Sequence, residues 1–417
     1  MIRHIAGARA NRLQAVPFIL VAVLAGAAAA VVPHAVKRHA GPDAEPLTIG
    51  PPVGMPGAPP TSADGLRQQI GAMEQRLQER PNDAGAAVLL ADALLRQGRA
   101  ANDGRPANRA ADILHGVLKE TPSQYDALRL LGAIYLSQHR FREALDVARR
   151  ARALRPADAW NYGVMGDALV ELGDYDEAFR AFDTMADMRP TAAAYARVAY
   201  GRELRGDLSG AMEAMRMAEQ ATPVQDPEAQ AWYAAQTGEL YLRTGKLQDA
   251  RRAFRRAAFL FANYPHAMIG EAKVMVALGD RDGALAAYLA QLKRTPTLDL
   301  AARIGDLYAE RHDTIESERY YRLAEDLAGP AAAQTEANLA LFLAEHDRNL
   351  PEAVRIAEAV AGARHDIFTE DALAWAYYKV GRRSEARAAL RQALRTGTRD
   401  GRILAHAARI ETASAAH

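Results

Sequence analysis

The chain has 417 residues and no cysteine, and its 52 Lys and Arg residues balance 51 Asp and Glu residues. The lack of cysteine excludes disulfide bonds, thiolate zinc sites and cysteine nucleophiles. The charge is balanced and no long block of one sign occurs, so the composition argues against a nucleic-acid partner.

Residues 1–36 are predicted to be a signal peptide or a single-pass membrane anchor. Arg3, Arg9 and Arg12 precede an uncharged run from Ala15 to Pro33, close to the roughly 20 residues that span a bilayer. The run could contain the apolar core of a cleaved signal peptide, or it could stay as an anchor. Either alternative puts the rest of the chain outside the cytoplasm, in the periplasm or at the cell surface. A helix of a cytoplasmic protein is a third, less favoured alternative.

Residues 37–65 differ in composition from everything around them. The stretch from His39 to Asp64 contains seven prolines and four glycines. Such a segment cannot build a core and is typical of an extended linker. If the N-terminal segment anchors the chain, the linker holds residues 66–417 away from the membrane.

Prolines recur along the rest of the chain at intervals of 31 to 42 residues, most often 33 or 34: Pro81, Pro122, Pro156, Pro190, Pro223, Pro265, Pro296 and Pro330. Between successive prolines lie two apolar helical stretches and a short turn. A fixed period of this length indicates a stacked array of helical hairpins.

The clearest unit runs from Ala159 to Pro190. Its first helix has apolar residues at helical spacing, and Gly173 followed by Asp174 predicts the end of that helix and the cap of the next. The second helix presents Ala178, Phe182 and Ala186 on one face. The first-helix face consists of Tyr162, Met165, Gly166 and Leu169.

These residues resemble the tetratricopeptide repeat, in which Leu-Gly and a tyrosine follow a large residue in the first helix. Nine units match, starting near Gly85, Tyr125, Ala159, Ala192, Ala231, Pro265, Leu298, Ala331 and Ile367. The resemblance implies an all-α, right-handed α-solenoid. Apolar helices around Leu66–Leu77 and Ile403–Ile410 are expected to cap its ends. The stretch 98–108 is expected to be a polar insertion in the first unit.

The resemblance also implies a concave groove lined by the first helices, in which a protein or peptide segment would bind. The three tryptophans of this set could be aromatic anchors for that segment or ordinary core residues. Carried over unit by unit, the groove residues include Arg129, Trp160, Asp167, Tyr200, Trp232, Glu239, Lys273, Asp306 and Trp375.

No catalytic motif, nucleotide-binding loop or metal-binding motif is found, so no catalytic residue, cofactor or metal is expected. Two turns, Glu310–Asp313 and Glu345–Asp347, combine His with carboxylates, and both are interpreted as helix ends. From Gly238 to Ile410 the chain resembles secreted or membrane-anchored tetratricopeptide proteins of bacteria. The expected function is a non-catalytic scaffold in the bacterial envelope. A self-associating structural protein and an enzyme with an unrecognised site are the alternatives.

Overall fold

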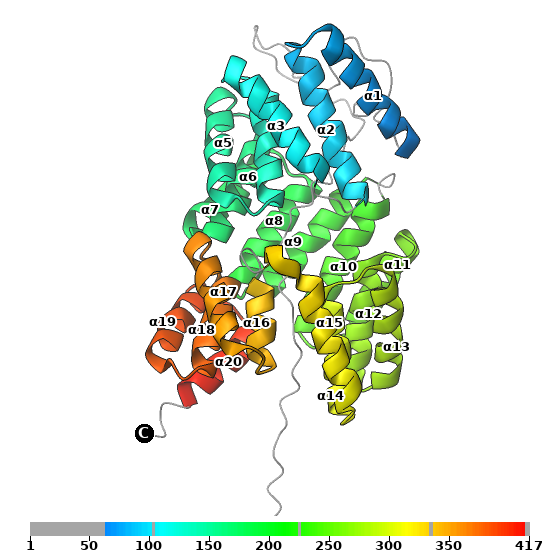
Figure 1. Ribbon diagram of the computed structural model, residues 1–417, viewed down its shortest axis with the longest axis vertical. Helices are drawn as coiled ribbons and strands as arrows, with labels where there is room; N and C mark the ends of the chain where they lie inside the picture. The colour runs from blue at the N-terminus through cyan, green and yellow to red at the C-terminus, as the bar shows by residue number, and fades with distance from the viewer. Residues whose placement is uncertain (1–62, 102–104, 224–226, 333–336, 413–417) are drawn as a thin grey trace, which may run out of the picture. The chain divides into compact units, whose positions relative to one another are not determined.

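The computed structural model describes residues 63–101, 105–223, 227–332 and 337–412, and the predicted membrane or signal segment and most of the linker lie outside them. Helices are the only regular elements in these residues (Figure 1). The chain divides into two compact units at residue 134, within helix α4, and each unit is described by itself.

The smaller unit contains four helices, the last of which crosses the boundary: α1 (Ala63–Glu79), α2 (Ala84–Ala101), α3 (Arg105–Glu120) and α4 (Tyr125–Ser137). Leu66, Ile70 and Met73 of α1 are buried, as the predicted capping helix requires. The expected polar insertion is mostly helical, because α2 extends to Ala101 and α3 begins at Arg105. The insertion expected between the two helices therefore consists largely of the end of α2 and the start of α3.

The larger unit contains the remaining helices: α5 (Phe141–Leu154), α6 (Ala159–Leu172), α7 (Tyr175–Met188), α8 (Ala192–Leu204), α9 (Leu208–Ala221), α10 (Pro227–Arg243), α11 (Leu247–Leu260), α12 (Pro265–Leu278), α13 (Arg281–Arg294), α14 (Leu298–Glu310), α15 (Thr314–Ala332), α16 (Ala337–Glu345), α17 (Leu350–Ala363), α18 (Ile367–Lys379), α19 (Arg383–Ala393) and α20 (Gly401–Thr412). Seven successive pairs, from α6/α7 to α18/α19, form helical hairpins. The predicted repeat solenoid is confirmed for the described residues.

The turns inside the hairpins use left-handed residues. Gly173 has φ of 83°, and its N–H donates to the carbonyl oxygens of Leu169 and Val170 at the end of α6. In the seventh predicted unit, which has no glycine at this point, His312 takes the left-handed position with φ of 62°. Asp207 caps α9 as expected, whereas the Asp174 side chain makes no capping hydrogen bond.

Aromatic residues in the second helices pack against glycines in the first helices. Phe254 of α11 is fully buried against Gly238 of α10 and Gly270 of α12. An added Cβ at Gly238 would lie 2.7–2.9 Å from the Phe254 ring. Because the same ring contacts its own hairpin and the next one, it fixes how successive hairpins stack.

Two predicted boundaries were wrong. Helix α10 begins at Pro227, four residues before the expected Ala231, because proline suits the first turn of a helix. Helix α15 continues past Pro330 to Ala332, and α16 begins only at Ala337. A proline near a helix end removes a single backbone hydrogen bond, so it does not have to stop the helix.

Candidate functional site

Four of the predicted groove residues carry charge, are in the larger unit and make ion pairs or hydrogen bonds within the chain. Asp167 of α6 pairs with Arg197 of α8 at 2.7 Å, and Glu239 of α10 pairs with Lys273 of α12 at 2.8 Å. In these two pairs every side chain is buried, with exposed fractions of 3–8% for Asp167, Arg197, Glu239 and Lys273. Burial raises the pKa of Asp167 against the lowering effect of Arg197, and burial lowers the pKa of Lys273. Each pair joins the first helices of successive hairpins.

Asp306 of α14 makes a third connection of this kind. Its carboxylate accepts a hydrogen bond from the Tyr321 hydroxyl at 2.9 Å and contacts His346 Nε2 at 2.8 Å. His346 follows α16, so the contact joins two successive first helices. The glutamate–histidine–aspartate turn that contains His346 thus serves packing between helices.

Two aromatic groove residues are buried. Tyr200 of α8 is 9% exposed, and burial raises its pKa well above the ordinary value. Trp375 of α18 is 8% exposed and stacks on His406 of α20 with ring centroids 4.0 Å apart. Trp375 therefore belongs to the core of the last hairpin.

The other three predicted groove residues are half-buried. Arg129 lies on α4 in the smaller unit, and Trp160 and Trp232 lie on α6 and α10 in the larger unit. Trp232 meets the neighbouring Tyr233 edge to face at 4.9 Å. These three side chains keep part of their surface in contact with solvent.

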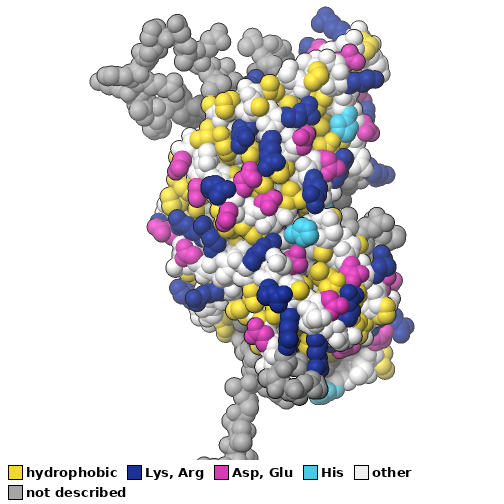
Figure 2. Space-filling view, turned by 90° about the vertical axis from the view of Figure 1, so that its left-hand side faces the viewer, with side chains coloured by type: hydrophobic (Ala, Val, Ile, Leu, Met, Phe, Trp, Pro, Cys, Tyr) yellow, Lys and Arg dark blue, Asp and Glu magenta, His cyan; other side chains and the backbone are white. Residues whose placement is uncertain are grey.

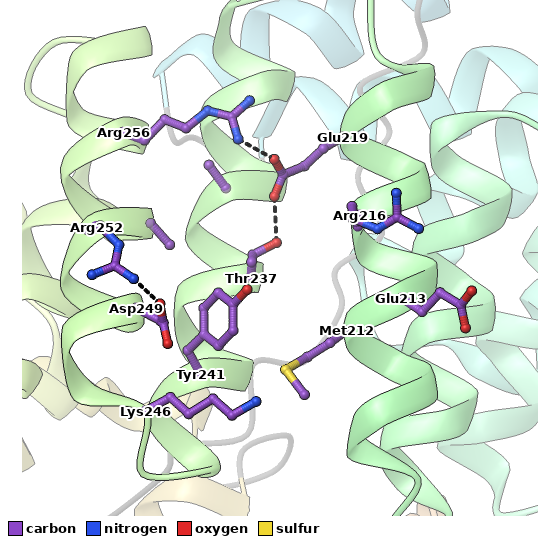
Figure 3. Close-up of a pocket in the computed structure, with 12 residues that line it drawn as sticks. Met212, Glu213, Arg216, Glu219, Thr237, Tyr241, Lys246, Asp249, Arg252 and Arg256 are labelled. Atoms are coloured by element: carbon purple, nitrogen blue, oxygen red, sulfur yellow. Dashed lines mark hydrogen bonds and ion pairs between the residues drawn. The ribbon is translucent and has the colours of Figure 1, made fainter.

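A furrow that the sequence analysis missed lies between α9 and α11, with α10 as its floor (Figure 3). Its volume is about 510 Å³ and it is open to solvent. We name it the α9–α11 furrow, and its lining residues are Met212, Glu213, Arg216, Glu219, Ala234, Thr237, Tyr241, Lys246, Asp249, Arg252, Ala253 and Arg256.

The α9–α11 furrow combines an apolar floor with charges of both signs. Glu219 spans it, accepting hydrogen bonds from Thr237 and from Arg256, each at 2.6 Å (Figure 3). Arg216 and Lys246 are exposed at the rim. The tetratricopeptide resemblance predicts that binding residues lie on the first helices. Because α9 and α11 are second helices, their residues were not predicted to bind. Charged residues at i, i+3 and i+6 of α9, which are Glu213, Arg216 and Glu219, could have signalled the furrow.

Basic and acidic side chains are interspersed on the face of the molecule seen in Figure 2. In the described part of the chain, no group of three or more His, Asp and Glu side chains is placed to hold a metal ion. No helix within the described ranges is long and apolar enough to cross a bilayer.

Comparison with known protein families agrees with the helical hairpins. Family models described as tetratricopeptide repeat match residues 135–199, and also residues 102–159 and 235–299. Residues 102–199 and 235–299 therefore carry tetratricopeptide repeats. A search of curated protein sequences found no match.

Solved structures match this chain at low sequence identity. A human IFIT1 dimer with m7Gppp-AAAA has a TM-score of 0.53 and 15% identity, covering 79% of this chain and 77% of its own. A tetratricopeptide repeat protein from Parabacteroides merdae has a TM-score of 0.45 and 16% identity, covering 58% of this chain and 94% of its own. Pseudomonas aeruginosa pilF has a TM-score of 0.41 and 16% identity, covering 59% of this chain and 99% of its own.

Proposed function

We propose that this protein is a non-catalytic scaffold that binds a protein segment in the α9–α11 furrow. The observation that supports the proposal is the furrow itself, which is open and combines apolar side chains with a rim of mixed charge. Met212 and Tyr241 would contact apolar side chains of the bound segment, and such contacts supply most of the affinity in protein interfaces. Arg216 and Lys246 on the rim would select the acidic positions of the segment and fix its register.

The predicted groove residues have two roles in this proposal. The half-buried Trp160 and Trp232 of the larger unit, which do not line the furrow, would provide further contacts to a protein partner. The other predicted groove residues of the larger unit would hold the first helices in place, because they are already engaged within the chain; they are the buried Asp167, Tyr200, Glu239, Lys273 and Trp375 and the half-buried Asp306.

Photo-crosslinking in the source organism tests the furrow. A photo-reactive amino acid replaces Glu213, which is exposed at the furrow, and in a matched control it replaces Asp183, which is exposed on α7. We expect one distinct protein to be captured from position 213 and not from position 183, and to be lost when Lys246 is changed to Glu. Capture of this chain alone would favour self-association, and capture of RNA or of nothing at position 213 would contradict the proposal.

We also propose that residues 63–412 lie outside the cytoplasm, in the periplasm or at the cell surface of a bacterium. The support is the arginine-flanked apolar run from Ala15 to Pro33 followed by the proline-rich linker. A fusion of alkaline phosphatase after Thr412 should be active in cells, since this enzyme needs an oxidising compartment for its disulfides. An inactive fusion would contradict the proposed location.

A further inference from the structure

The last five helices of the larger unit, α16–α20, contact two separate parts of the same unit. We call them the C-terminal module. One contact is with the C-terminal ends of α6, α8 and α10 and the turns that follow, and the other is with the α14/α15 hairpin. Figure 1 shows the module in yellow-orange to red. The first contact is made through hydrogen bonds and ion pairs, and the second also contains apolar packing, since the Tyr321 ring of α15 meets Phe342 of α16 edge to face at 5.9 Å.

The first contact centres on the segment between α17 and α18. The backbone N–H of His365 donates to the carbonyl oxygen of Glu171 at 3.0 Å, and the N–H of Ile367 donates to the Tyr175 hydroxyl at 2.7 Å. The Arg364 guanidinium, itself buried, lies 2.7 Å from the Glu171 carboxylate. The segment is therefore held through its backbone and its side chains together.

Cations of the module also face the C-terminal ends of first helices. Arg395 donates to the carbonyl oxygen of His365 next to the turn at Gly173, and Arg399 packs against Gly206 after α8. In the other direction, Arg243 at the end of α10 lies 3.7 Å from Asp400. Positive charge at these helix ends is favourable because the carbonyl groups there carry partial negative charge.

Two glycines allow this close approach. An added Cβ at Gly173 would lie 2.7 Å from the carbonyl oxygen of His365, and one at Gly206 would lie 2.6 Å from that of Gly397. Gly245 has the same left-handed backbone with φ of 72°, yet an added Cβ there would meet nothing within 4 Å. Gly206 and Gly245 thus differ in whether the module packs against them.

The second contact uses His346 and Arg348. Nε2 of His346 lies 2.8 Å from Asp306 of α14, and its Nδ1 lies 2.8 Å from the carbonyl oxygen of Phe342. Arg348 pairs with Glu318 of α15 at 2.6 Å and also with Glu325. Both ring nitrogens of His346 face acceptors, so both must carry hydrogen for the two contacts to be hydrogen bonds.

The first contact contains more buried carboxylates than buried guanidinium groups. Three buried carboxylates, those of Asp167, Glu171 and Asp366, share two buried guanidinium groups, those of Arg197 and Arg364. The buried carboxylates of this cluster outnumber its buried guanidinium groups by one, and a buried charge without a partner is unfavourable. Tyr175, Tyr200 and the exposed Arg395 also face the cluster, and Arg395 lies over the Tyr175 ring at 4.9 Å. Protonation of Glu171 would remove the excess negative charge, so that the docked module would hold one proton at each of its two contacts.

We propose that the C-terminal module is a pH-sensitive closing element, which stays docked while Glu171 and His346 are protonated and leaves the ends of α6, α8 and α10 when they lose their protons. Release would expose Tyr175, Glu171 and the surface around the Gly173 and Gly206 turns. The inference concerns a surface other than the α9–α11 furrow and does not depend on the function proposed for it.

The direction of the pKa shifts agrees with this mechanism. Burial raises the pKa of Glu171 to about 8; Arg364 lowers it, and Asp366 and Asp167 raise it further. Burial lowers the pKa of His346, but Asp306, the Phe342 carbonyl group and Glu345 raise it more, so the pKa lies above the ordinary value. A pKa raised in the docked state means that docking is most stable at low pH and weakens as the pH rises through the raised values. The expected window is from neutral pH to somewhat above pH 8.

Distances between spin labels test the proposal, and the lack of native cysteine allows labels to be placed at will. One label replaces exposed Asp187 on α7 and the other exposed Arg391 on α19 of the module. Double electron–electron resonance at about pH 6 should give one narrow distance distribution, and at about pH 9.5 a second, longer population should appear. Labels at Asp187 and Arg216, both outside the module, serve as the control and should not change.

Three variants separate release of the module from other effects of pH. Glu171→Gln should reduce the longer population at high pH, because the glutamine cannot lose a proton. Gly206→Ala should produce the longer population already at neutral pH, whereas Gly245→Ala should not. The proposal is overturned if the Asp187–Arg391 distances stay the same at both pH values, or if Gly206→Ala and Gly245→Ala give the same distribution.

Discussion

At the scale of single residues, helical glycines have two different environments. Gly166 of α6 has the Phe182 ring directly against it, and an added Cβ would also lie 3.2 Å from the Ala178 carbonyl oxygen. Gly362 of α17 has nothing within 4 Å of such an atom. The repeat pattern singled out Gly166 in the sequence, and the structure supplies the reason, which is the close approach of α6 and α7.

Gly166→Leu is expected to unfold at least the α6/α7 hairpin, because the side chain has no space where the helices cross. The smaller change Gly166→Ala should lower the free energy of unfolding by about 1–3 kcal/mol through overpacking. Gly362→Ala, the matched control, should raise it by about 0.5–1 kcal/mol, since alanine favours a helix more than glycine does. Urea unfolding followed by circular dichroism measures all three. An unchanged midpoint for Gly166→Leu would contradict the register of the repeat.

His406 provides a second test at this scale. Its Nδ1 lies 2.9 Å from Asp371 and its Nε2 lies 3.7 Å from Glu345, while Arg402 also pairs with Asp371. Burial lowers the pKa of His406, but the two carboxylates raise it more, so it lies above the ordinary value.

The imidazolium contribution to stability should therefore be fully present below about pH 6.5 and be lost as the pH rises through the raised pKa. NMR titration of the His406 ring should show this raised pKa, and Asp371→Asn should lower it. A His406 pKa below 6.5 in the native protein would contradict the geometry.

At the scale of helices, buried polar contacts join first helices that follow each other in the array. Asp167 with Arg197 joins α6 to α8, and Glu239 with Lys273 joins α10 to α12. Apolar packing fills the rest of the space between hairpins. These pairs set the rotation of one hairpin against the next only if both partners are present, because a buried charge without its partner is strongly unfavourable.

Removing one member of the Glu239–Lys273 pair should be much worse than replacing both. Glu239→Leu should lower the free energy of unfolding by about 3–5 kcal/mol, because Lys273 stays buried without its carboxylate. The double replacement Glu239→Leu and Lys273→Met should change it by about 1 kcal/mol or less. A double-mutant cycle in urea measures the coupling. Additive effects of the two single changes would contradict a direct interaction.

The helices themselves were largely predictable from the sequence, because proline, glycine and apolar spacing act locally. Seven of the nine expected unit starts agree with the start of a helix to within a residue. The contacts that the predicted groove residues make within the chain were not predictable. Helical periodicity puts Asp167 and Glu239 on a shared face, but only the structure shows that Arg197 and Lys273 meet them there. The α9–α11 furrow was missed because it depends on the separation of two second helices.

At the scale of the larger unit, residues far apart in the sequence are brought together by the C-terminal module. Ile367 bonds to Tyr175 across 192 positions of the chain. No local sequence pattern predicts such a contact. From the sequence, the last half-unit, around Ile403, was expected to be a simple cap. Leu404, an apolar residue of that expected cap, is 45% exposed, while Arg402 and His406 are buried in contact with α18.

We expect that residues 1–62 are not needed for folding of the helical repeats. The first described helix begins at Ala63, and its buried face begins at Leu66. A chain that starts at Ala63 should keep the helical circular dichroism signal and the melting temperature of the full chain to within about 2 °C. A loss of helical signal would show that the N-terminal segment takes part in the fold.

The measurement that tests the central claim most directly is calorimetric titration of the protein captured at the α9–α11 furrow into three forms of this chain. Lys246→Glu, at the rim of the furrow, should weaken binding about tenfold or more relative to the unchanged chain. Arg180→Glu is an equal charge reversal at an exposed position of α7. It should leave the dissociation constant within about a factor of two of that of the unchanged chain. Equal affinities for all three forms would contradict binding in the furrow.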